Sequence, residues 1–549
     1  MPTGKPSTKL SGARLAPPEK STSSSLARSA ASAGAATMTS RILGVVREQV
    51  LASFFGAGAA MDAYNVAFRI PNLLRDLFAE GAMSAAFVPT FTTALATSGK
   101  EPAWRLGNHV INALIVVTGA LVVLGIVFME PLILSFAAEK YTSDPKQLAL
   151  TVLMARIMLP ALTLIALAAA LMGMLNSLHH YFVPALSPAS FNVLTIACAF
   201  ALVPFMPAFG LDPIVAIAIG TLLGGVAQIA LQWPTLHNEG FRYRLEVDWK
   251  DPGLRRMLTL MGPGTVGLAA TQVNVFVNTL LATGTETGAV SWLQYAFRLM
   301  YLPIGLFGVS IATAVLPTVS RHTADRNEEA VRDTIANGVS LMLMLNVPAS
   351  VGLVVLAHPI VRVILERGRF TAADTAATAG ALQFYAIGLL AYSVVRIVSP
   401  IFYALGRSRI PVIVSAMTVL VNAGLNTAMV RMLGFRGLAL GTSIAALFNA
   451  ITLLVVLRKH LHGIHDGRIL GAFARISIAA GAMGVVAALL SQWVETRWPG
   501  GAVLLQIVRL SVTIGVSLVV LGVASWLLRI REFNEGMALV ARRLGRRSR

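Results

Sequence analysis

The sequence predicts an all-α polytopic membrane protein, and three observations support this. The chain of 549 residues is 56% hydrophobic and only 13% charged, and its mean hydropathy is +0.72, which is more apolar than a soluble protein of this length requires. Apolar runs such as 112–128 and 510–528 approach the roughly 20 residues that cross a bilayer. These runs lack the two-residue alternation of barrel strands, so we expect helices.

Apolar runs separated by short polar loops predict about 14 spans, grouped as two six-helix lobes and two C-terminal helices. Residues 1–30 are rich in Ser, Ala, Pro and Lys and lack a signal-peptide core, so they are predicted to be a disordered cytoplasmic extension. The N-lobe (31–236) is expected to contain spans near 31–55, 62–95, 108–136, 148–178, 182–206 and 213–236.

A basic cytoplasmic loop is expected over 237–256, between the two lobes. The C-lobe (257–457) follows, with spans near 257–284, 289–319, 333–356, 375–403, 409–432 and 437–457. Two further spans are predicted near 470–493 and 503–528, within a unit covering 470–528. Residues 529–549 are read as a basic cytoplasmic tail that lies near anionic headgroups.

The two lobes are related by an internal repeat. AFRIPNLLRDLF at 67–78 aligns with AFRLMYLPIGLF at 296–307, and IGTLLGGVAQ at 219–228 aligns with LGTSIAALFN at 440–449. The two shifts, 229 and 221 residues, are nearly equal. Repeats that run in the same direction predict a pseudo-two-fold axis along the membrane normal and a cavity between the lobes.

Loop charges predict the orientation of the chain. Most loop Lys and Arg residues lie on the side that carries both tails, so both termini are expected in the cytoplasm of a bacterium, with the chain in its inner membrane. The formal charge of +19 is explained by this bias, and we expect no nucleic-acid partner. Arg362, Arg367 and Arg369 are exceptions, in an external loop expected to contain a short interfacial helix.

Cysteine and histidine usage indicates no metal site and no cofactor. A single cysteine, Cys198, excludes an internal disulfide, and no Cys/His group has the spacing of metal ligands. His179 and His180 stand together before an apolar run, where we expect a helix-end or interfacial role.

Arginines inside the predicted spans are the strongest functional signal. Arg41 and Arg47 lie six residues apart in the first span, and Arg69 and Arg75 six apart in the second. Six residues turn a helix by about 240° net, so some members of each pair are expected to face the cavity while others snorkel or pair with helices behind it. An arginine at the centre of a span costs about 2.5–3.5 kcal/mol, so those retained usually face a partner or a wet cavity.

Carboxylates accompany these arginines, but arginine is in excess. Glu48, Asp62, Asp76 and Glu80 could form interhelical ion pairs, whereas Arg156, Arg298 and Arg396 lie in or near apolar stretches without a local acid. The excess predicts an electropositive cavity suited to phosphate or pyrophosphate. Pro71 and Pro303 break the second span of each lobe and indicate either hinges or close helix packing.

Residues 40–91, SRILGVVREQVLASFFGAGAAMDAYNVAFRIPNLLRDLFAEGAMSAAFVPTF, strongly resemble the MurJ/MviN family of lipid II flippases. The resemblance continues through 171–192, 261–279, 291–317 and 434–450, so it covers nearly everything after residue 30. That family belongs to the superfamily of multidrug exporters and polysaccharide flippases, with two six-helix lobes and two additional C-terminal helices.

The resemblance implies a transporter, not an enzyme, that moves the undecaprenyl-pyrophosphate-linked peptidoglycan precursor from the inner to the outer leaflet. It implies lipid II and membrane lipids as partners, with other cell-wall synthesis proteins as candidates, and we expect a monomer. The family's substrate-binding arginines fall on Arg41, Arg47, Arg75 and Arg298, and its gating acids on Glu48, Asp62 and Glu80. Arg69, the repeat partner of Arg298, is expected to be structural.

Some family features differ in this chain. Relatives often read Arg-Arg where this chain has Arg75-Asp76, so one positive charge is lost. Some relatives have an Asn and an Asp, four apart, as a sodium site; here the pair is Asn422 and Asn426, and we expect no sodium site. The resemblance also implies a lipid-tail groove formed by 470–493 and 503–528, which we expect to be purely apolar.

Other functions remain open at this stage. A flippase for another polyprenyl-linked glycan would need the same anionic cavity. A MATE-like antiporter of cationic drugs is disfavoured, because a cation site needs unpaired acids in the helices. A membrane-embedded glycosyltransferase is disfavoured because the chain has no long loop and no DxD pattern.

Overall fold

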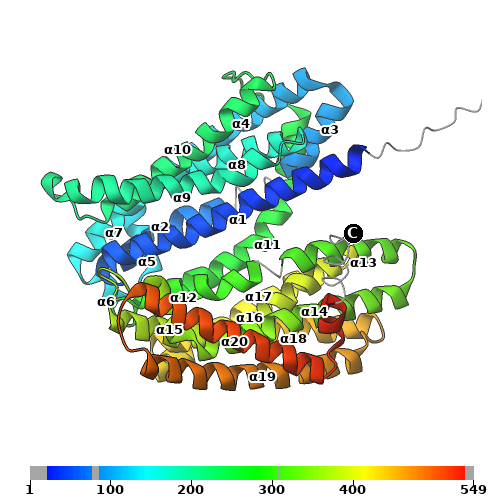
Figure 1. The fold of residues 1–549 in the computed structure, drawn as a ribbon. Coiled ribbons are helices and arrows are strands. Elements are labelled where there is room, and N and C mark those ends of the chain that lie inside the picture. The colour runs from blue at the N-terminus through cyan, green and yellow to red at the C-terminus, as the bar shows by residue number, and fades with distance from the viewer. Residues whose placement is uncertain (1–20, 77–85, 306–308, 538–549) are drawn as a thin grey trace, which may run out of the picture.

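The computed structural model describes residues 21–76, 86–305 and 309–537, and in these ranges the chain forms helices and no strand. Two helical lobes lie one above the other in Figure 1, and the first and last described residues, 21 and 537, lie at the same end of the molecule. We call this the terminal end. The opposite end contains the turns 56–58, 284–288 and 366–371, and we call it the junction end.

The N-lobe begins with a long helix and has short helices at its rim. Its helices are α1 (Ser21–Phe55), α2 (Ala59–Arg75), α3 (Val88–Ser98), α4 (Lys100–Val127), α5 (Met129–Phe136), α6 (Glu139–Thr142), α7 (Pro145–Met158), α8 (Ala161–Ser177), α9 (Phe182–Leu202) and α10 (Val215–Asn238). A 3-10 helix, η3 (Val203–Phe209), continues α9.

The C-lobe repeats this order. Its helices are α11 (Pro252–Thr283), α12 (Ala289–Pro303), α13 (Val309–Ala324), α14 (Glu328–Val355), α15 (Ala357–Leu365), α16 (Ala372–Ala404), α17 (Arg409–Leu433) and α18 (Phe435–His460). The broken pair α12 and α13 corresponds to α2 and α3, and the short α15 corresponds to α5. The short helix expected near Arg362 is present as α15, which contains Arg362; its position at the membrane interface stays a prediction.

The two C-terminal helices, α19 (Asp466–Arg497) and α20 (Val503–Leu527), pack against each other and cover one side of the C-lobe. α19 packs on α14, and α20 touches α15. The expectation of purely apolar helices is wrong at two positions, because Arg475 lies in α19 and Arg509 in α20. A long arginine is tolerated near a helix end, where its charged head can reach the headgroup region.

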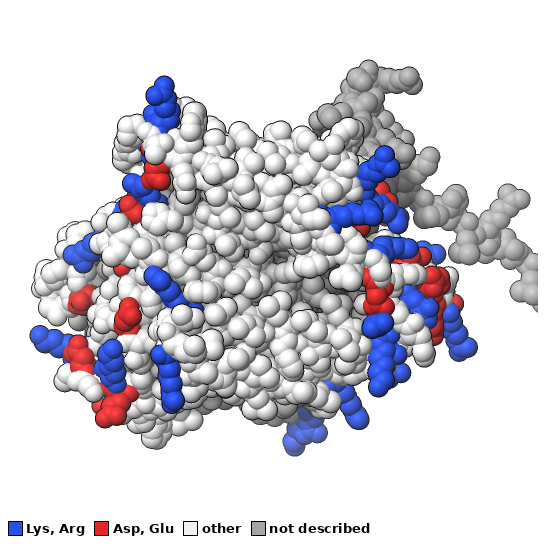
Figure 2. Space-filling model, turned by 90° about the horizontal axis from the view of Figure 1, so that it is seen from below, with Lys and Arg blue, Asp and Glu red and all other residues white. Residues whose placement is uncertain are grey.

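Ten helical segments of the described chain are long and apolar enough to cross a membrane. They are 100–127, 145–177, 182–209, 215–238, 328–355, 372–404, 409–433, 435–460, 466–497 and 503–527. The helices α1, α2 and α12 are not among these ten, so the count of fourteen spans stays a prediction. Charged side chains gather toward the two ends of the molecule and leave a broad uncharged belt between them (Figure 2).

Three apolar cores explain how the lobes are joined. One contains residues of both lobes, among them Leu51 and Met61 from the N-lobe and Leu293 and Leu365 from the C-lobe. A second is formed by α13, α14 and α16–α20 of the C-lobe, and a third by α3, α4, α8 and α10 of the N-lobe together with the start of α11, which packs on the N-lobe. The lobes therefore share a core at the junction end and have separate cores toward the terminal end.

Candidate substrate cavity between the lobes

Two adjoining cavities of about 430 and 520 Å³ lie between the lobes. Their walls come from α1, α2, α8, α9 and α10 on one side and from α11, α12, α15 and α16 on the other. They share Arg47, Arg69, Gln294 and Arg298, so they form one continuous arginine-lined space. A third cavity of about 240 Å³ adjoins it at Arg69 and Gln294.

The first helix contributes Arg41 and Arg47. The Nη2 of Arg47 donates to Glu48 Oε1 at 2.8 Å, and its guanidinium lies 5.6 Å from the centre of the Phe191 ring. Arg47 Nε is buried and has no acceptor among the described residues. Arg41 lies against Gly305 of the other lobe and has no hydrogen-bond or ion-pair partner in the described ranges.

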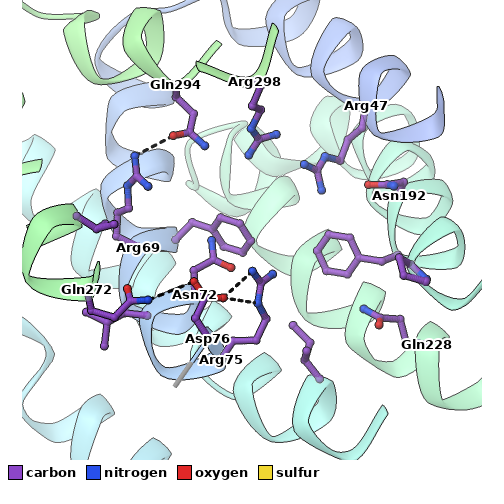
Figure 3. A pocket seen from close by; sticks show the side chains of 16 residues that line it. Arg47, Arg69, Asn72, Arg75, Asp76, Asn192, Gln228, Gln272, Gln294 and Arg298 are labelled. Carbon is purple, nitrogen blue, oxygen red and sulfur yellow. Dashed lines mark hydrogen bonds and ion pairs between the residues drawn. The ribbon is translucent and has the colours of Figure 1, made fainter. Parts of the chain in front are cut away.

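The second helix contributes Arg69 and Arg75, both visible in Figure 3. Arg69 reaches across to the C-lobe, where its Nη2 donates to Gln294 Oε1 at 2.8 Å. Arg75 donates to Asp76 Oδ1 from Nη2 at 2.9 Å and from Nε at 3.2 Å. The other oxygen of Asp76 accepts from Gln272 Nε2 of α11 at 3.4 Å.

Glu48 joins the two lobes inside this space. Its side chain is buried, with the residue 8% exposed, and it forms ion pairs with Arg47 of its own helix and with Arg298 of α12. A carboxylate held between two arginines offsets part of the cost of bringing both cations out of water. Separating the lobes along this line would break the pair with Arg298.

The structure adds two arginines to the predicted set. Arg69, expected to be structural, lines all three cavities. Arg396 of α16 lines the second cavity, donates to the hydroxyl of Tyr301, and lies 5.3 Å from the centre of the Tyr301 ring. In the sequence, the lack of an acidic residue near Arg396 was the feature that could have indicated its place in the cavity. Arg156 carries the same signal but is exposed outside the cavity, where its Nε donates to Ile126 O at 3.1 Å.

The expectation that only some members of each arginine pair face the cavity is wrong. Arg41 and Arg47 both line the second cavity, and Arg69 and Arg75 both line the first. The cavities extend around more than one side of α1 and α2, so a 240° turn still leaves both side chains in contact with the same space.

Positive charge exceeds negative charge in this lining. Among the described residues, the first two cavities are lined by six arginines and by two carboxylates, Glu48 and Asp76. The planar guanidinium fork matches phosphate geometry and binds it through paired hydrogen bonds. The arrangement therefore suits an anion with several oxygens.

Asp62 lies at the junction end, away from this lining. It is 3% exposed and accepts from Gly288 N at 2.6 Å, Ser291 N at 2.9 Å and Ser291 Oγ at 2.6 Å. Its partners are thus neutral donors of the other lobe, where we expected an ion pair. Asp62 and Ser291 are 229 residues apart, the shift of the internal repeat, so equivalent positions of α2 and α12 meet here.

Other contacts close the junction end around Asp62. Arg369 N donates to Ser53 O at 2.8 Å, and Tyr295 Oη donates to Gly56 O at 3.3 Å. Gly288 has φ +96°, and a Cβ there would lie 2.5 Å from Ala57 O, so a side chain at this position would push the lobes apart. Glu80, the remaining predicted gating acid, lies outside the described residues.

A group of amide side chains reaches the third cavity through Asn278. Asn426 Nδ2 donates to Asn278 Oδ1 at 2.6 Å and to Asn422 Oδ1 at 2.9 Å, and lies 3.4 Å from Thr442 Oγ1. Asn278, Asn422, Asn426 and Thr442 are all uncharged, and among the described residues no carboxylate lines this cavity. The expectation of no sodium site stays a prediction.

In the described part of the chain, one group has the geometry to hold a metal ion: Glu329, Asp333 and His465, with ligand atoms within 4.8 Å of one another. Arg468 donates to Asp333 Oδ1 at 2.9 Å, and Arg332 pairs with Glu329 at 3.5 Å. These arginines already neutralise both carboxylates, so the group lacks the unpaired acids that a cation needs.

The chain is similar to proteins of a known family. The family model described as lipid II flippase MurJ matches residues 51–509. A probable lipid II flippase MurJ of Rhizobium meliloti is 34% identical over 85% of this chain and 87% of its own length. The corresponding protein of Vibrio cholerae is 33% identical over 93% of this chain and 96% of its own length.

Solved structures show the same architecture. A structure described as lipid II flippase MurJ in an inward closed conformation aligns with a TM-score of 0.73 at 28% identity, covering 90% of this chain and 99% of that one. A MATE-family multidrug transporter of the MOP superfamily, in an inward-facing conformation, aligns with a TM-score of 0.67 at 15% identity, covering 78% and 96%. At that identity the second likeness concerns the fold alone.

Proposed function

The chain belongs to the MurJ family of lipid II flippases, and from this premise we propose how its cavity moves the substrate. It is a multi-pass membrane protein and acts as a lipid II flippase, a transporter. We propose that the pyrophosphate of the undecaprenyl-linked precursor binds in the arginine-lined space while the precursor crosses from the inner to the outer leaflet. The excess of arginine over carboxylate in that space is the observation that supports this assignment.

Arg41, Arg47, Arg75 and Arg298 are the proposed substrate-binding residues. They approach the same space from both lobes, so one pyrophosphate could be held by α1, α2 and α12 together. Arg41 has no partner in the described ranges, and its guanidinium is available to an anion. We extend the proposal to Arg69 and Arg396, which line the same cavities.

Glu48 and Asp62 are proposed to control the two ends of the cycle. Glu48 competes with the pyrophosphate for Arg47 and Arg298, so binding of the anion would loosen one link between the lobes. Asp62 holds the junction end shut through Gly288 and Ser291. Opening that end would complete the passage.

The proposed orientation places both termini in the cytoplasm of a bacterium, with the chain in its inner membrane. The shared core and the Asp62 contacts close the junction end, which would face outward. Lobes that have separate cores at the terminal end can move apart there, and this supports an inward-facing starting state. The prenyl tail would stay in lipid or against α19 and α20.

Two transporter alternatives differ in what they require of the cavity. A MATE-like exporter of cationic compounds needs unpaired acids, whereas Glu48 and Asp76 are both paired with arginine. A flippase for another polyprenyl-pyrophosphate glycan would use the same arginines. Depleting the protein and identifying the lipid-linked precursor that accumulates would distinguish that alternative.

The central test is a flipping assay with defined lipid II in vesicles that contain the purified protein. Arg41→Ala and Arg298→Ala should abolish translocation while leaving the protein folded, because each removes a cation that only the substrate neutralises fully. Arg156→Ala is the matched control, since Arg156 is an arginine in an apolar stretch outside the cavity. Normal flipping by both cavity variants would contradict the proposed site.

A further inference from the structure

A small basic pocket lies at the junction end, outside the cavity between the lobes. It is formed where α15, α19 and α20 meet along one side of the C-lobe (Figure 1). Its polar lining includes His358 and Arg362 of α15, Glu495 of α19, and Gln506 and Arg509 of α20. Its volume of about 50 Å³ corresponds to roughly three to five waters, or one compact polar group.

Arg509 is the unexplained residue in this pocket. Its Nε and Nη2 are both buried, and neither has an acceptor among the described residues. Its guanidinium folds back toward the α19–α20 turn, with Nη2 4.0 Å from a Cβ built at Gly500. Burying guanidinium N–H groups without an acceptor is costly, so the site is built for an acceptor that the polypeptide does not provide.

The neighbouring carboxylates are paired with another arginine and not with Arg509. The two nearby carboxylates are engaged by Arg362, which pairs with Glu495 at 3.1 Å and with Glu366 at 3.5 Å. Gln506 Nε2 donates to Gly501 O at 3.0 Å, which fixes this side chain beside the pocket. Arg509 is therefore the one cation of the pocket without a carboxylate in the described chain.

The surroundings of the pocket indicate a lipid ligand. Leu504, Ile507 and Val508 of α20 are exposed around Arg509. Only 17% of the most apolar stretch of α20 is buried. Arg509 lies close to the start of a membrane-crossing helix, at headgroup depth, where arginine side chains meet lipid phosphates. A phosphate oxygen pair would satisfy Nε and Nη2 together.

We propose that this pocket binds the phosphate of a membrane phospholipid, with Arg509 as the main ligand. His358 lies in the lining as a second donor, and the pairs with Glu366 and Glu495 hold Arg362 in place beside it. In the orientation proposed above, the lipid belongs to the outer leaflet. The bound headgroup would fix α15, next to the junction end, against α20. This inference concerns a site apart from the arginine-lined cavity and does not depend on flipping.

The test is native mass spectrometry of the delipidated full-length protein, titrated with phosphatidylglycerol. Arg509→Gln should weaken binding by about tenfold, the effect expected for loss of a charge-assisted pair. Arg497→Gln is the control: it removes an exposed arginine at the same end of α19 and should bind as the unsubstituted protein does. Diacylglycerol, which lacks the phosphate, should bind equally to all three proteins.

Three results would overturn the proposal. They are equal phosphatidylglycerol binding by the unsubstituted protein and Arg509→Gln, an equal loss in Arg497→Gln, and displacement of phosphatidylglycerol by an equimolar amount of undecaprenyl pyrophosphate. The last result would assign the pocket to the substrate. Arg509→Lys serves as a conservative variant, because it keeps the positive charge but loses the planar fork. It should bind phosphatidylglycerol with an affinity between those of the unsubstituted protein and Arg509→Gln, which a misfolded protein would not do.

Discussion

Glu48 shows how one carboxylate can organise several arginines. It forms ion pairs with Arg47 and with Arg298, which come from different lobes. Adjacency in the sequence predicts only the first pair. The second depends on how α1 and α12 approach each other, so the role of Glu48 as a link between the lobes comes from the tertiary structure.

Removing this charge should change the affinity for the substrate. In Glu48→Gln, Arg47 and Arg298 lose their competing anion, and a pyrophosphate lipid should bind about tenfold more tightly. Release should slow, and the flipping rate should fall. Equilibrium binding of undecaprenyl pyrophosphate and the flipping assay measure the two effects separately. Glu239→Gln is the control, because Glu239 pairs with His180 and Lys100 outside the cavity; unchanged affinity in Glu48→Gln would refute the competition.

Glu239 gives a pH-dependent contact at the terminal end. It follows α10 and pairs with His180 Nε2 at 2.8 Å and with Lys100 Nζ at 3.0 Å. The hydrogen bond with His180, and next that with Lys100, lowers the pKa of Glu239 from its ordinary value of 4.5. His180 lies at a helix end, in the turn between α8 and α9.

A carboxylate whose pKa is lowered by folding stabilises the folded state at pH values above its ordinary pKa. This stabilisation is lost as the pH falls through the lower pKa of the folded state. The turn at 178–181 should therefore loosen only below about pH 4.5. Hydrogen exchange of these amides, corrected for intrinsic rates, should rise there. In Glu239→Gln, the exchange rate of these amides should already be raised at neutral pH and should not rise further as the pH falls. Glu246→Gln, a change in the neighbouring loop, should behave as the unsubstituted protein; a pH response in Glu239→Gln would exclude Glu239 as its origin.

At the scale of helices, the elements that build the cavity are the least apolar ones. α1, α2 and α12 miss the criteria that ten other segments meet, and they carry Arg41, Arg47, Arg69, Arg75 and Arg298. A helix facing a polar cavity needs apolar residues only on its outer side. Hydropathy therefore underestimates the helices that matter most for function, and the intramembrane arginines identify them better.

The junction of α2 and α12 can be tested through Asp62. Asp62→Asn keeps the shape but removes the charge that strengthens three hydrogen bonds, so the junction end should open more often. With Cys198→Ser as background, a cysteine introduced by Ala57→Cys should react with a membrane-impermeant maleimide about tenfold faster when Asp62→Asn is added.

Asp212→Asn is the control for that experiment. Asp212 lies at the same end but accepts from Ile214 N within its own lobe, so its loss should leave the reactivity at position 57 unchanged. If Asp62→Asn also leaves it unchanged, Asp62 does not hold the junction.

At the scale of the whole molecule, the distribution of the cores determines the motion available. One core crosses between the lobes at the junction end, while two others are separate from it: one within the C-lobe, and one that joins the N-lobe to the start of α11. Rocking about the junction end would preserve both separate cores and change mainly the shared one. The internal repeat predicts two similar bodies, but the position of their contact follows only from packing.

The membrane potential should act on the transported anion. The arginines stay with the protein, so an inside-negative potential favours outward movement of the pyrophosphate by up to about 2.3 kcal/mol per net charge per 100 mV. Flipping in vesicles should be several-fold faster with the potential inside-negative at the terminal end than with it reversed. The Arg156→Ala protein should respond in the same way. Equal rates under both potentials would show that no net charge moves in the limiting step.

The sequence by itself determined the helical membrane class, the internal repeat and the excess of arginine within the apolar spans. Bilayer length and insertion cost impose these features locally, so they can be read from composition and spacing. It also predicted Arg41, Arg47, Arg75 and Arg298, although the functional roles of these residues remain proposals.

Only the tertiary structure decided which side chains meet. It brought Arg69 and Arg396 into the cavity, placed Asp62 on Gly288 and Ser291, and left Arg509 of a helix expected to be purely apolar without an acceptor in the described chain. The physical reason is that helical periodicity fixes a side chain's direction relative to its own axis. Which neighbour lies in that direction depends on how the two lobes pack.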